Sequence, residues 1–279
     1  MLNYLIVDEI IKGALKEDIP YGDITASSVV TKGSLAKASL IAKEDGIICG
    51  LPIFERVFTI LGKVEFVSFC EEGSNVKSGD IIGEVKGDAL NILMGERVAL
   101  NLLQKMSGIA TLTNKYINEI KDLKTKLLDT RKTTANLRIL EKYAVKIGGG
   151  NNHRFSLSDG VLIKDNHIGY AGSIKEAIRL AKKNSSFVRK IEVETESKED
   201  VLEALEAGAD IIMLDNMSPL QVAEMVKLIN GRAITECSGN ITLNTIRDYA
   251  LSGVDFISSG ELTHSVKAFD ISLKNFIQL

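Results

Sequence analysis

Apolar and polar positions in the second half of the chain follow two alternating periods. Short runs rich in apolar and β-branched residues are typical of buried strands, and the stretches between them place apolar residues three or four positions apart, as amphipathic helices do. The pattern predicts strands at 124–130, 161–165, 190–196, 210–216, 232–239 and 255–261. The last four begin roughly 20 residues apart, which leaves room for one helical return each and predicts a parallel sheet.

Six strands with such even spacing favour a closed α/β barrel. A doubly wound open sheet is the alternative, although no GxGxxG motif follows any of the predicted strands. We therefore predict that the second part of the chain is an α/β barrel.

The first ~100 residues follow a different pattern. Helices at 7–16 and 52–61, with strands near 63–70 and 79–87, predict an α+β module with antiparallel strands. Residues 95–121 form a long helical segment, predicted to break near Gly108, that links the two parts. The glycine-turned hairpin predicted at 71–87 is similar to that of biotinyl and lipoyl carrier domains. No MKM or DKA lysine site follows it, which favours a purely structural hairpin.

Length, composition and charge exclude several classes of protein. With 279 residues, 45% hydrophobic and 25% charged, the chain has room for a barrel plus a smaller domain. A net charge of −3 argues against a nucleic-acid partner. No apolar run approaches the ~20 residues of a membrane span, and the acidic N-terminal segment is unlike a signal peptide. Cys49, Cys70 and Cys237 lack CxxC or zinc spacing, so we expect reduced thiols in a cytoplasmic protein.

Polar residues at the predicted strand ends carry the candidate chemistry. In α/β barrels the active site lies at the carboxyl ends of the strands, so these residues are expected to meet at one mouth. Neighbouring cations repel each other, and their coincidence here favours a polyanionic ligand. Singly, each has a simpler explanation, such as a salt bridge between Lys164 and Asp165. The cationic or potentially cationic residues are Arg131, Lys132, His153, Arg154 and Lys164.

Two carboxylates and two serine–glycine turns complete the predicted mouth. Glu194 and Asp215, on neighbouring strands, could bind Mg²⁺, hydrogen-bond sugar hydroxyls or stabilise developing positive charge. SGN (238–240) and SSGE (258–261) lie at the last two strand ends, where barrels bind phosphate through backbone N–H groups and serine hydroxyls. The ligand predicted from these residues is a phosphorylated sugar that carries further anionic groups.

Segments from most of the chain, in this order, resemble the quinolinate phosphoribosyltransferase family. They are EDIPYGDIT, GERVALNLLQKMSGIAT, DTRKTT, GGGNNHR, LIKDNHI, IEVE, IMLDN, SGN and GVDFISSGELTHS. One departure is visible: the family usually reads TRKTTPGLR, whereas this chain reads TRKTTANLR. Ala135 and Asn136 replace a Pro-Gly turn, which leaves the local turn geometry open.

The resemblance implies a fold, an activity and an assembly. The fold is an N-terminal α/β sandwich domain (1–106, completed by 267–279) and an incomplete α/β barrel of the type II phosphoribosyltransferases (107–266). The implied reaction joins quinolinate to 5-phosphoribosyl 1-diphosphate, with Mg²⁺, and gives nicotinate mononucleotide, pyrophosphate and CO₂ in de novo NAD synthesis. The implied assembly is a homodimer, or a larger assembly of dimers, in which Arg97 acts in the site of the partner subunit.

The resemblance also assigns roles by matching position. The residues matched to quinolinate contacts are Arg97, Arg131 and Arg154, with His153 and Lys164 nearby. The residues matched to diphosphate contacts are Lys132 and Lys164. Lys132, Glu194 and Asp215 are the expected catalytic residues, with Glu194 and Asp215 near the ribose hydroxyls and the metal. The remaining expected substrate-binding residues, most of them around the 5′-phosphate, are Thr133, Ser238, Gly239, Asn240, Ser259, Gly260 and Glu261.

Four alternative functions stay open at this point. Molybdenum-associated relatives keep the fold and change the substrate. A nicotinate-specific transferase would need fewer arginines, because nicotinate has a single carboxylate. A barrel aldolase or decarboxylase would use Lys164 to form a Schiff base, and a carrier or scaffold protein would have no activity.

Overall fold

The computed structural model describes residues 2–279, and Met1 lies outside the described residues. The chain divides into two compact units. Unit 1 comprises Met1–Asn114, Thr133–Gly149 and Ser265–Leu279, and unit 2 comprises Lys115–Lys132 and Gly150–His264. Among the described residues, none of the helices combines the length and the apolar character that crossing a membrane requires.

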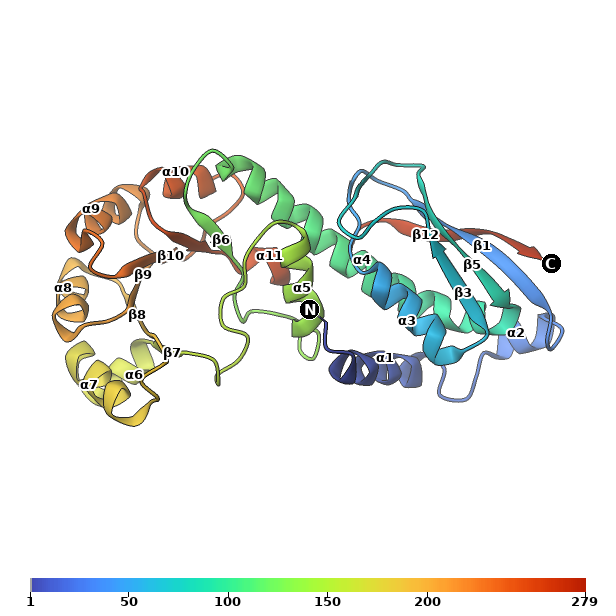
Figure 1. Ribbon diagram of the computed structural model, residues 1–279, viewed down its shortest axis with the longest axis horizontal. Coiled ribbons are helices and arrows are strands. Elements are labelled where there is room, and N and C mark those ends of the chain that lie inside the picture. The colour runs from blue at the N-terminus through green and yellow to red at the C-terminus, as the bar shows by residue number, and fades with distance from the viewer. Residues whose placement is uncertain (1) are drawn as a thin grey trace. The chain divides into compact units, whose positions relative to one another are not determined.

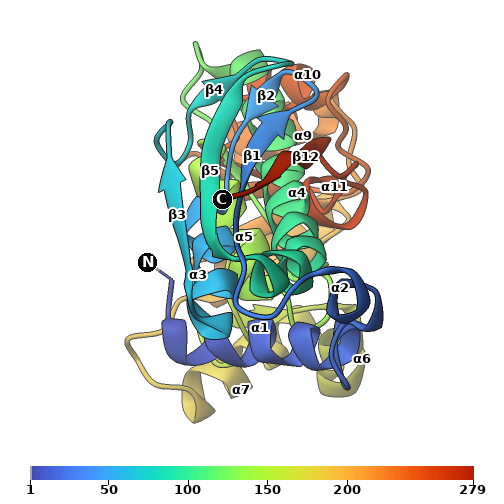
Figure 2. The ribbon, with the colours of Figure 1, turned by 90° about the vertical axis from the view of Figure 1, so that its right-hand side faces the viewer.

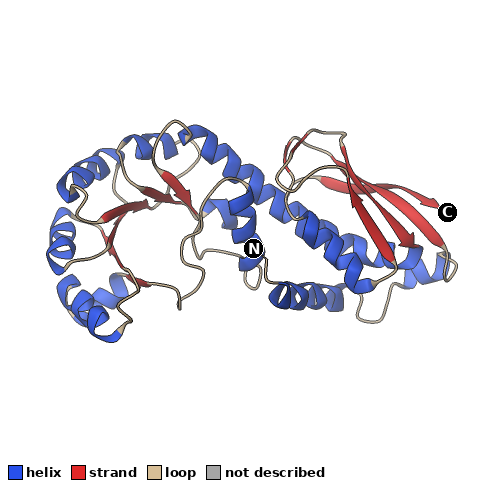
Figure 3. Cartoon of the chain, viewed as in Figure 1, coloured by secondary structure: helices blue, strands red, loops and turns tan. Residues whose placement is uncertain are grey.

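An antiparallel sheet with the strand order β12-β1-β5-β3 forms the centre of unit 1 (Figures 1 and 3). On β1, alternate residues from Ala36 to Ala42 are buried, because successive side chains of a strand point to opposite faces. Helix α3 (Leu51–Leu61) lies beside β3 (Figure 2). Phe54 of the helix packs edge-to-face on Phe66 of the strand, with ring centroids 4.9 Å apart. The strands are β1 (Leu35–Ala42), β3 (Val64–Ser68), β5 (Ile81–Asp88) and β12 (Ile271–Gln278).

The segment 71–87 does not form the predicted hairpin. Its first strand, β4 (Asn75–Val76), pairs with β2 (Gly46–Ile47), whereas β5 pairs with β1 and β3. The segment therefore connects two separate sheets. The remaining helices of unit 1 are α1 (Tyr4–Asp18), α2 (Ile24–Val29) and α5 (Arg138–Ile147).

Helix α4 is continuous from Ala89 to Ile120 and contributes residues to both units, so the predicted break near Gly108 is wrong. Gly108 is a point of close approach within unit 1. A Cβ at this position would lie 2.3 Å from the carbonyl oxygen of Lys267. The absence of a side chain allows the Lys267 backbone to pack directly on the helix.

A six-stranded parallel sheet with the order β6-β11-β10-β9-β8-β7 forms the centre of unit 2. The sheet curves with its helices on the outer side, and β6 and β7 are its two edges (Figure 1). The incomplete α/β barrel that the family resemblance implied is confirmed. The closed barrel that the strand spacing favoured is not, because the edge strands β6 and β7 of this sheet do not pair with each other. Every strand lies within its predicted range: β6 (Lys126–Leu128), β7 (Val161–Ile163), β8 (Ile191–Thr195), β9 (Ile211–Asp215), β10 (Ile234–Ser238) and β11 (Phe256–Ser258).

Helices of unit 2 follow the strands as the alternating pattern predicted. Helix α9 begins with Ser218 as N-cap, whose hydroxyl accepts the N–H of Gln221, and with Pro219 in the first turn. Helix α8 ends at Gly208, which adopts the left-handed conformation with φ 73°. The helices are α6 (Asp165–Ala171), α7 (Ile174–Asn184), α8 (Lys198–Ala207), α9 (Pro219–Ile229), α10 (Ile246–Leu251) and α11 (Glu261–His264).

Candidate active site

The carboxyl ends of the strands of unit 2 surround a cavity of about 420 Å³, which we call the upper cavity. Residues from all six strand ends and from the segment after Gly150 contribute to its wall. Ten of the residues predicted from the sequence line it: Arg131, Lys132, His153, Arg154, Lys164, Glu194, Asp215, Ser238, Gly239 and Asn240. The other six lining residues are Thr130, Leu162, Met213, Asn216, Glu236 and Ser258, of which Ser258 belongs to the predicted SSGE turn.

Local hydrogen bonds fix the backbone of Lys132 directly after β6. Its N–H donates to the hydroxyl of Thr130 (3.0 Å), and its carbonyl accepts the hydroxyl of Thr263 (2.8 Å). A Cβ at Gly260 would lie 3.1 Å from Cδ of Lys132, so the glycine leaves room for the lysine side chain. The sequence places two cations side by side, and these contacts hold their backbone in place.

The segment Asn151–Arg154 reaches the cavity because it pairs with the edge strand β6. Asn151 donates its N–H to the Leu127 carbonyl (2.8 Å) and accepts the N–H of Asp129 (3.1 Å). The fully buried Asp129 carboxylate accepts the N–H of His153 (2.9 Å). These contacts bring His153 and Arg154 to the end of the strand that leads into Arg131.

The two arginines of the cavity influence each other electrostatically. Burial lowers the pKa of Arg154, and the positive charge of Arg131 lowers it further. Both guanidinium groups remain charged, because arginine is not deprotonated in proteins. Their repulsion is relieved when an anion binds between them, and a planar guanidinium binds a carboxylate through two parallel hydrogen bonds.

Glu194 and Asp215 lie beside each other at the ends of β8 and β9. Burial raises the pKa of Asp215, and the negative charge of Glu194 raises it further. Lys164 Nζ lies 2.7 Å from Glu194 Oε2, and Asn216 donates its amide to Asp215 Oδ2 (2.7 Å). The oxygen donors of this carboxylate pair suit Mg²⁺, which is bound through carboxylates, waters and substrate oxygens.

The SGN turn after β10 depends on left-handed backbone. Gly239 has φ 100° and Asn240 has φ 51°. A Cβ at Gly239 would lie 2.3 Å from Oδ1 of Asn216, so only glycine fits against this side chain. Ser238, Gly239 and Asn240 of the turn line the cavity, and turns of this kind bind phosphate through backbone N–H groups and hydroxyls.

Two of the predicted residues belong to unit 1. Thr133 accepts a hydrogen bond at its hydroxyl from Nε of Arg138 (3.0 Å). Arg97 lies on α4 with its side chain exposed. The proposed action of Arg97 on a partner subunit stays a prediction.

The SSGE turn contributes Ser258 to the cavity wall, and its next three residues lie outside the lining set. The hydroxyl of Ser259 donates to the carbonyl of Ile241 (3.0 Å). The Glu261 carboxylate accepts the hydroxyl of the buried Tyr116. In this structure, Ser259 and Glu261 bind protein groups that support the turn.

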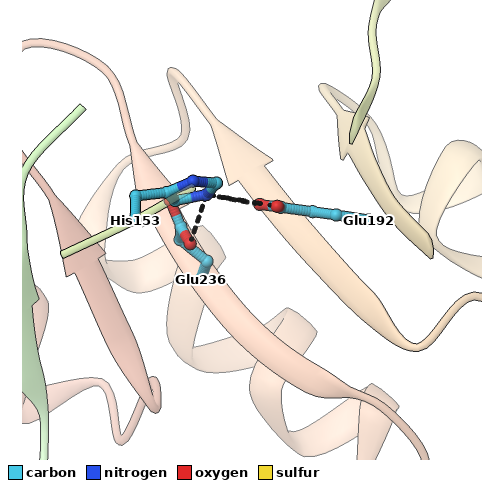
Figure 4. A group of neighbouring side chains, drawn as sticks. All are labelled: His153, Glu192 and Glu236. Atoms are coloured by element: carbon cyan, nitrogen blue, oxygen red, sulfur yellow. Dashed lines mark hydrogen bonds and ion pairs between the residues drawn. The ribbon is translucent and has the colours of Figure 1, made fainter. Parts of the chain in front are cut away.

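Sequence reasoning missed two buried glutamates that meet His153 (Figure 4). Nε2 of His153 lies 3.1 Å from Glu192 Oε2 and 3.5 Å from Glu236 Oε2, and the glutamates are only 4% and 2% exposed. Burial lowers the pKa of His153, whereas hydrogen bonds and charges from the two carboxylates raise it. The N–H that Arg154 donates to Nδ1 opposes this rise, because an imidazolium carries a hydrogen on both nitrogens and could not accept it, so the ring is neutral with its hydrogen on Nε2. A signal was present: Glu192 precedes Glu194 by two residues, as Glu236 precedes Ser238, and such pairs share one face of a strand.

The His153–Glu192–Glu236 cluster is compact enough to hold a metal ion. However, Nδ1 of His153 accepts the backbone N–H of Arg154 (2.7 Å), so the ring hydrogen lies on Nε2 and points to the carboxylates. If Nε2 bound a metal, the hydrogen of the neutral ring would have to lie on Nδ1, where it would meet the N–H of Arg154. The geometry is that of a hydrogen-bonded cluster and does not suit a metal centre.

Comparison with known proteins assigns the family. Residues 109–274 match the C-terminal domain of quinolinate phosphoribosyl transferase, and residues 23–107 match its N-terminal domain. The chain belongs to the quinolinate phosphoribosyl transferase family. The resemblance seen in the sequence motifs is thereby confirmed.

Individual members of the family align with almost the whole chain. A protein of Bacillus subtilis, named a probable nicotinate-nucleotide pyrophosphorylase (carboxylating), is 44% identical over 98% of this chain and 94% of its own length. A protein of the same name from Methanocaldococcus jannaschii is 46% identical over 95% of each chain. The crystal structure of NadC from Streptococcus pyogenes superposes with a TM-score of 0.96 at 45% identity, over 100% of this chain and 99% of that one.

Proposed function

We propose that this protein transfers the phosphoribosyl group of 5-phosphoribosyl 1-diphosphate to quinolinate and releases pyrophosphate and CO₂, giving nicotinate mononucleotide. The observation that carries the proposal is the upper cavity, where Arg131 and Arg154 lie together beside the Glu194–Asp215 pair. The names of the relatives in Bacillus subtilis and Methanocaldococcus jannaschii agree with it.

The guanidinium groups of Arg131 and Arg154 bind quinolinate. Quinolinate carries two adjacent carboxylates, and each can accept a bidentate pair of hydrogen bonds from an arginine. Arg131 and Arg154 supply two such groups in one cavity. Nicotinate, with one carboxylate, would leave one of these groups without its partner, so the pair favours quinolinate over nicotinate.

Transfer of the phosphoribosyl group requires stabilisation of positive charge on the ribose. When the bond to the diphosphate breaks, an oxocarbenium-like ribose develops, and the Glu194 and Asp215 carboxylates stabilise that charge. Lys132 and Lys164 bind the leaving diphosphate, and the SGN turn binds the 5′-phosphate. Mg²⁺, bound through Glu194, Asp215 and substrate oxygens, would add positive charge at the diphosphate.

Decarboxylation needs little from the protein. After the ring nitrogen has attacked C1′, the quaternised pyridinium withdraws electrons from C2 and weakens the bond to the adjacent carboxylate, which leaves as CO₂ while C2 takes up a proton from water. The lining set accordingly contains many groups that bind anions, and the Nε2 of its one histidine, His153, is turned to the carboxylates.

We also propose that the active protein is a homodimer or a larger assembly of dimers, with Arg97 of one subunit completing the site of the other. An exposed arginine on a long helix is available for such a contact. This part of the proposal is independent of the chemistry and has its own test in the Discussion.

The experiment that tests the activity is release of CO₂ from quinolinate labelled in its 2-carboxylate. Label should appear only when 5-phosphoribosyl 1-diphosphate and Mg²⁺ are both present, with pyrophosphate in equal amount. Consumption of nicotinate without CO₂ would indicate the nicotinate-specific transferase. Absence of turnover with either acid would leave the molybdenum-associated relatives or a carrier protein as the better reading.

A further inference from the structure

Beneath the upper cavity lies a second hollow inside unit 2, of about 600 Å³, which we call the lower cavity. Its wall includes residues at or near the starts of strands: Val161, Ile211, Ile234 and Phe256. The interiors of barrels are normally filled by layers of such side chains. Here the residues between the two cavities have little packed core under them.

Three residues line both cavities: His153, Arg154 and Glu236. They form the partition between the upper and the lower cavity. A side chain in a protein core is usually held in one rotamer by its neighbours on every side. The His153 side chain lines both cavities, so its packing contacts are incomplete and do not by themselves explain its orientation.

Hydrogen bonds hold His153 at three points. Its backbone N–H donates to Asp129 (2.9 Å), and its Nδ1 accepts the N–H of Arg154 (2.7 Å). Its Nε2–H points to Glu192 and Glu236, 3.1 and 3.5 Å away, on strands β8 and β10 (Figure 4). The His153 ring is therefore held by side chains from two strands, β8 and β10, that are not neighbours in the sheet.

The two buried glutamates are compensated at this depth by His153. A buried carboxylate is costly unless a partner compensates it, and Oε1 of Glu236 makes no hydrogen bond among the described residues. Glu192 lies one inward-facing position below Glu194, and Glu236 one below Ser238, so both lie just under the reacting groups.

We propose that Glu192 and Glu236 are positioning residues that hold the His153 ring through its Nε2–H, so that the partition presents His153 and Arg154 to quinolinate in one fixed arrangement. The inference rests on the proposed function, because it names quinolinate as the substrate. The two glutamates do not themselves contact quinolinate. Their effect passes through His153 to Arg154, whose backbone N–H is bonded to the same ring.

The kinetic test compares Glu192→Gln and Glu236→Gln with Asp255→Asn. Asp255 is a matched control: its carboxylate accepts the N–H and the hydroxyl of Thr235 on β10 (2.9 and 2.7 Å), and it does not line either cavity. Both glutamate variants should raise KM for quinolinate, by up to about a hundredfold if the partition moves by an ångström, and change KM for 5-phosphoribosyl 1-diphosphate no more than about twofold. Asp255→Asn should leave both constants unchanged. An unchanged KM for quinolinate overturns the proposal. An equal rise of the KM values for both substrates, with a fall in Tm greater than that of Asp255→Asn, also overturns it.

A spectroscopic test needs no turnover and uses a variant only to assign one signal. The chain has three histidines, so ¹⁵N-histidine labelling gives three imidazole spin systems, and the one lost in His153→Asn belongs to His153. In the wild-type protein the Nε2 of His153 should show the shift of a protonated nitrogen. A Nε2 with the shift of a bare or metal-bound nitrogen overturns the proposal. If wild-type protein releases no CO₂ from quinolinate, the proposed function fails, and this measurement still decides whether the glutamates hold the ring.

Discussion

The Lys164 ammonium and the Glu194 carboxylate form an ion pair at 2.7 Å in the wall of the upper cavity. A lysine that forms a Schiff base needs a nitrogen that is free to attack a carbonyl carbon, whereas the Lys164 nitrogen is held by the Glu194 carboxylate. The pair therefore argues against the aldolase alternative and favours an electrostatic role for Lys164.

Borohydride trapping checks this conclusion. We expect no covalent adduct on Lys164 when borohydride is added with quinolinate or with a sugar phosphate, because the ion pair with Glu194 holds the Lys164 nitrogen. Intact-mass measurement followed by peptide mapping detects an adduct. A mass increase located on Lys164 would restore the Schiff-base mechanism.

Arg131→Ala should weaken quinolinate binding far more than binding of 5-phosphoribosyl 1-diphosphate. Removing one partner of a buried, bidentate charged contact costs about 2–5 kcal/mol. Calorimetric titration of each substrate separately measures the two losses. Arg232→Ala is the control, because the Arg232 side chain binds carbonyls at the end of α9. Equal losses for both substrates in Arg131→Ala would contradict the assignment.

Glu194→Gln and Asp215→Asn should lower turnover more than they weaken quinolinate binding. Their proposed action is on ribose charge and on the metal, and one preorganised electrostatic group is worth about 10²–10³ in rate. Steady-state kinetics with both substrates checks this. Glu203→Gln serves as the control, since Glu203 accepts the N–H of Lys175 on the outer helices. Near-normal kcat in both site variants would mean that the carboxylates are structural.

Mixing two inactive variants tests the action of Arg97 across the subunit interface. Arg97→Ala retains an intact barrel, and Lys132→Ala retains an intact arginine for its neighbour, so exchange of subunits should restore activity. Random reassociation of equal amounts makes about half the dimers mixed, each with one intact site, which sets a ceiling of about a quarter of wild-type sites. If subunit exchange is demonstrated and no activity returns, Arg97 acts within its own chain or has no role.

Gly108→Ala should destabilise the protein, whereas Gly13→Ala should stabilise it. Both glycines lie inside helices, but a Cβ at Gly108 would meet the Lys267 carbonyl at 2.3 Å, and a Cβ at Gly13 would meet nothing within 4 Å. Overpacking costs about 1–3 kcal/mol, and an exposed Gly-to-Ala change in a helix gains about 0.5–1 kcal/mol. Urea unfolding followed by circular dichroism measures both changes. A neutral Gly108→Ala would mean that the Lys267 backbone moves away at no cost.

Local pattern was sufficient to predict the strands of the barrel and most of the cavity wall. A parallel strand is buried on both faces, so its apolar run is visible in the sequence, and the residues after it must meet at one edge. Long-range contacts were not visible. A glycine at position 108 is compatible both with a helix end and with close packing of another backbone, and the sequence does not distinguish the two. The pairing of Glu192 and Glu236 with His153 depends on where the Asn151 segment pairs with β6.

The turn at Ala135 and Asn136, where the family has Pro-Gly, is a second feature that the sequence alone did not explain. Asn136 adopts φ 64°, the left-handed conformation that glycine usually takes, and asparagine tolerates it better than other residues that carry a side chain. The substitution thus keeps a left-handed residue where the family has its Pro-Gly turn. Sequence alone showed the departure, and the backbone angle shows why it is tolerated.

Strand pairing has a consequence for how this chain folds during synthesis. In unit 1, β1 pairs with β12, and in unit 2, β6 pairs with β11, so each sheet joins segments that are far apart in the sequence. Neither sheet can be completed on the ribosome before its late strand has emerged, and contacts of such high sequence separation form slowly. Until then β1 is without its β12 neighbour and Arg131 is without the sheet that positions it. The nascent chain therefore passes through a long period with open strand edges, in which chaperones that bind extended segments would act on it.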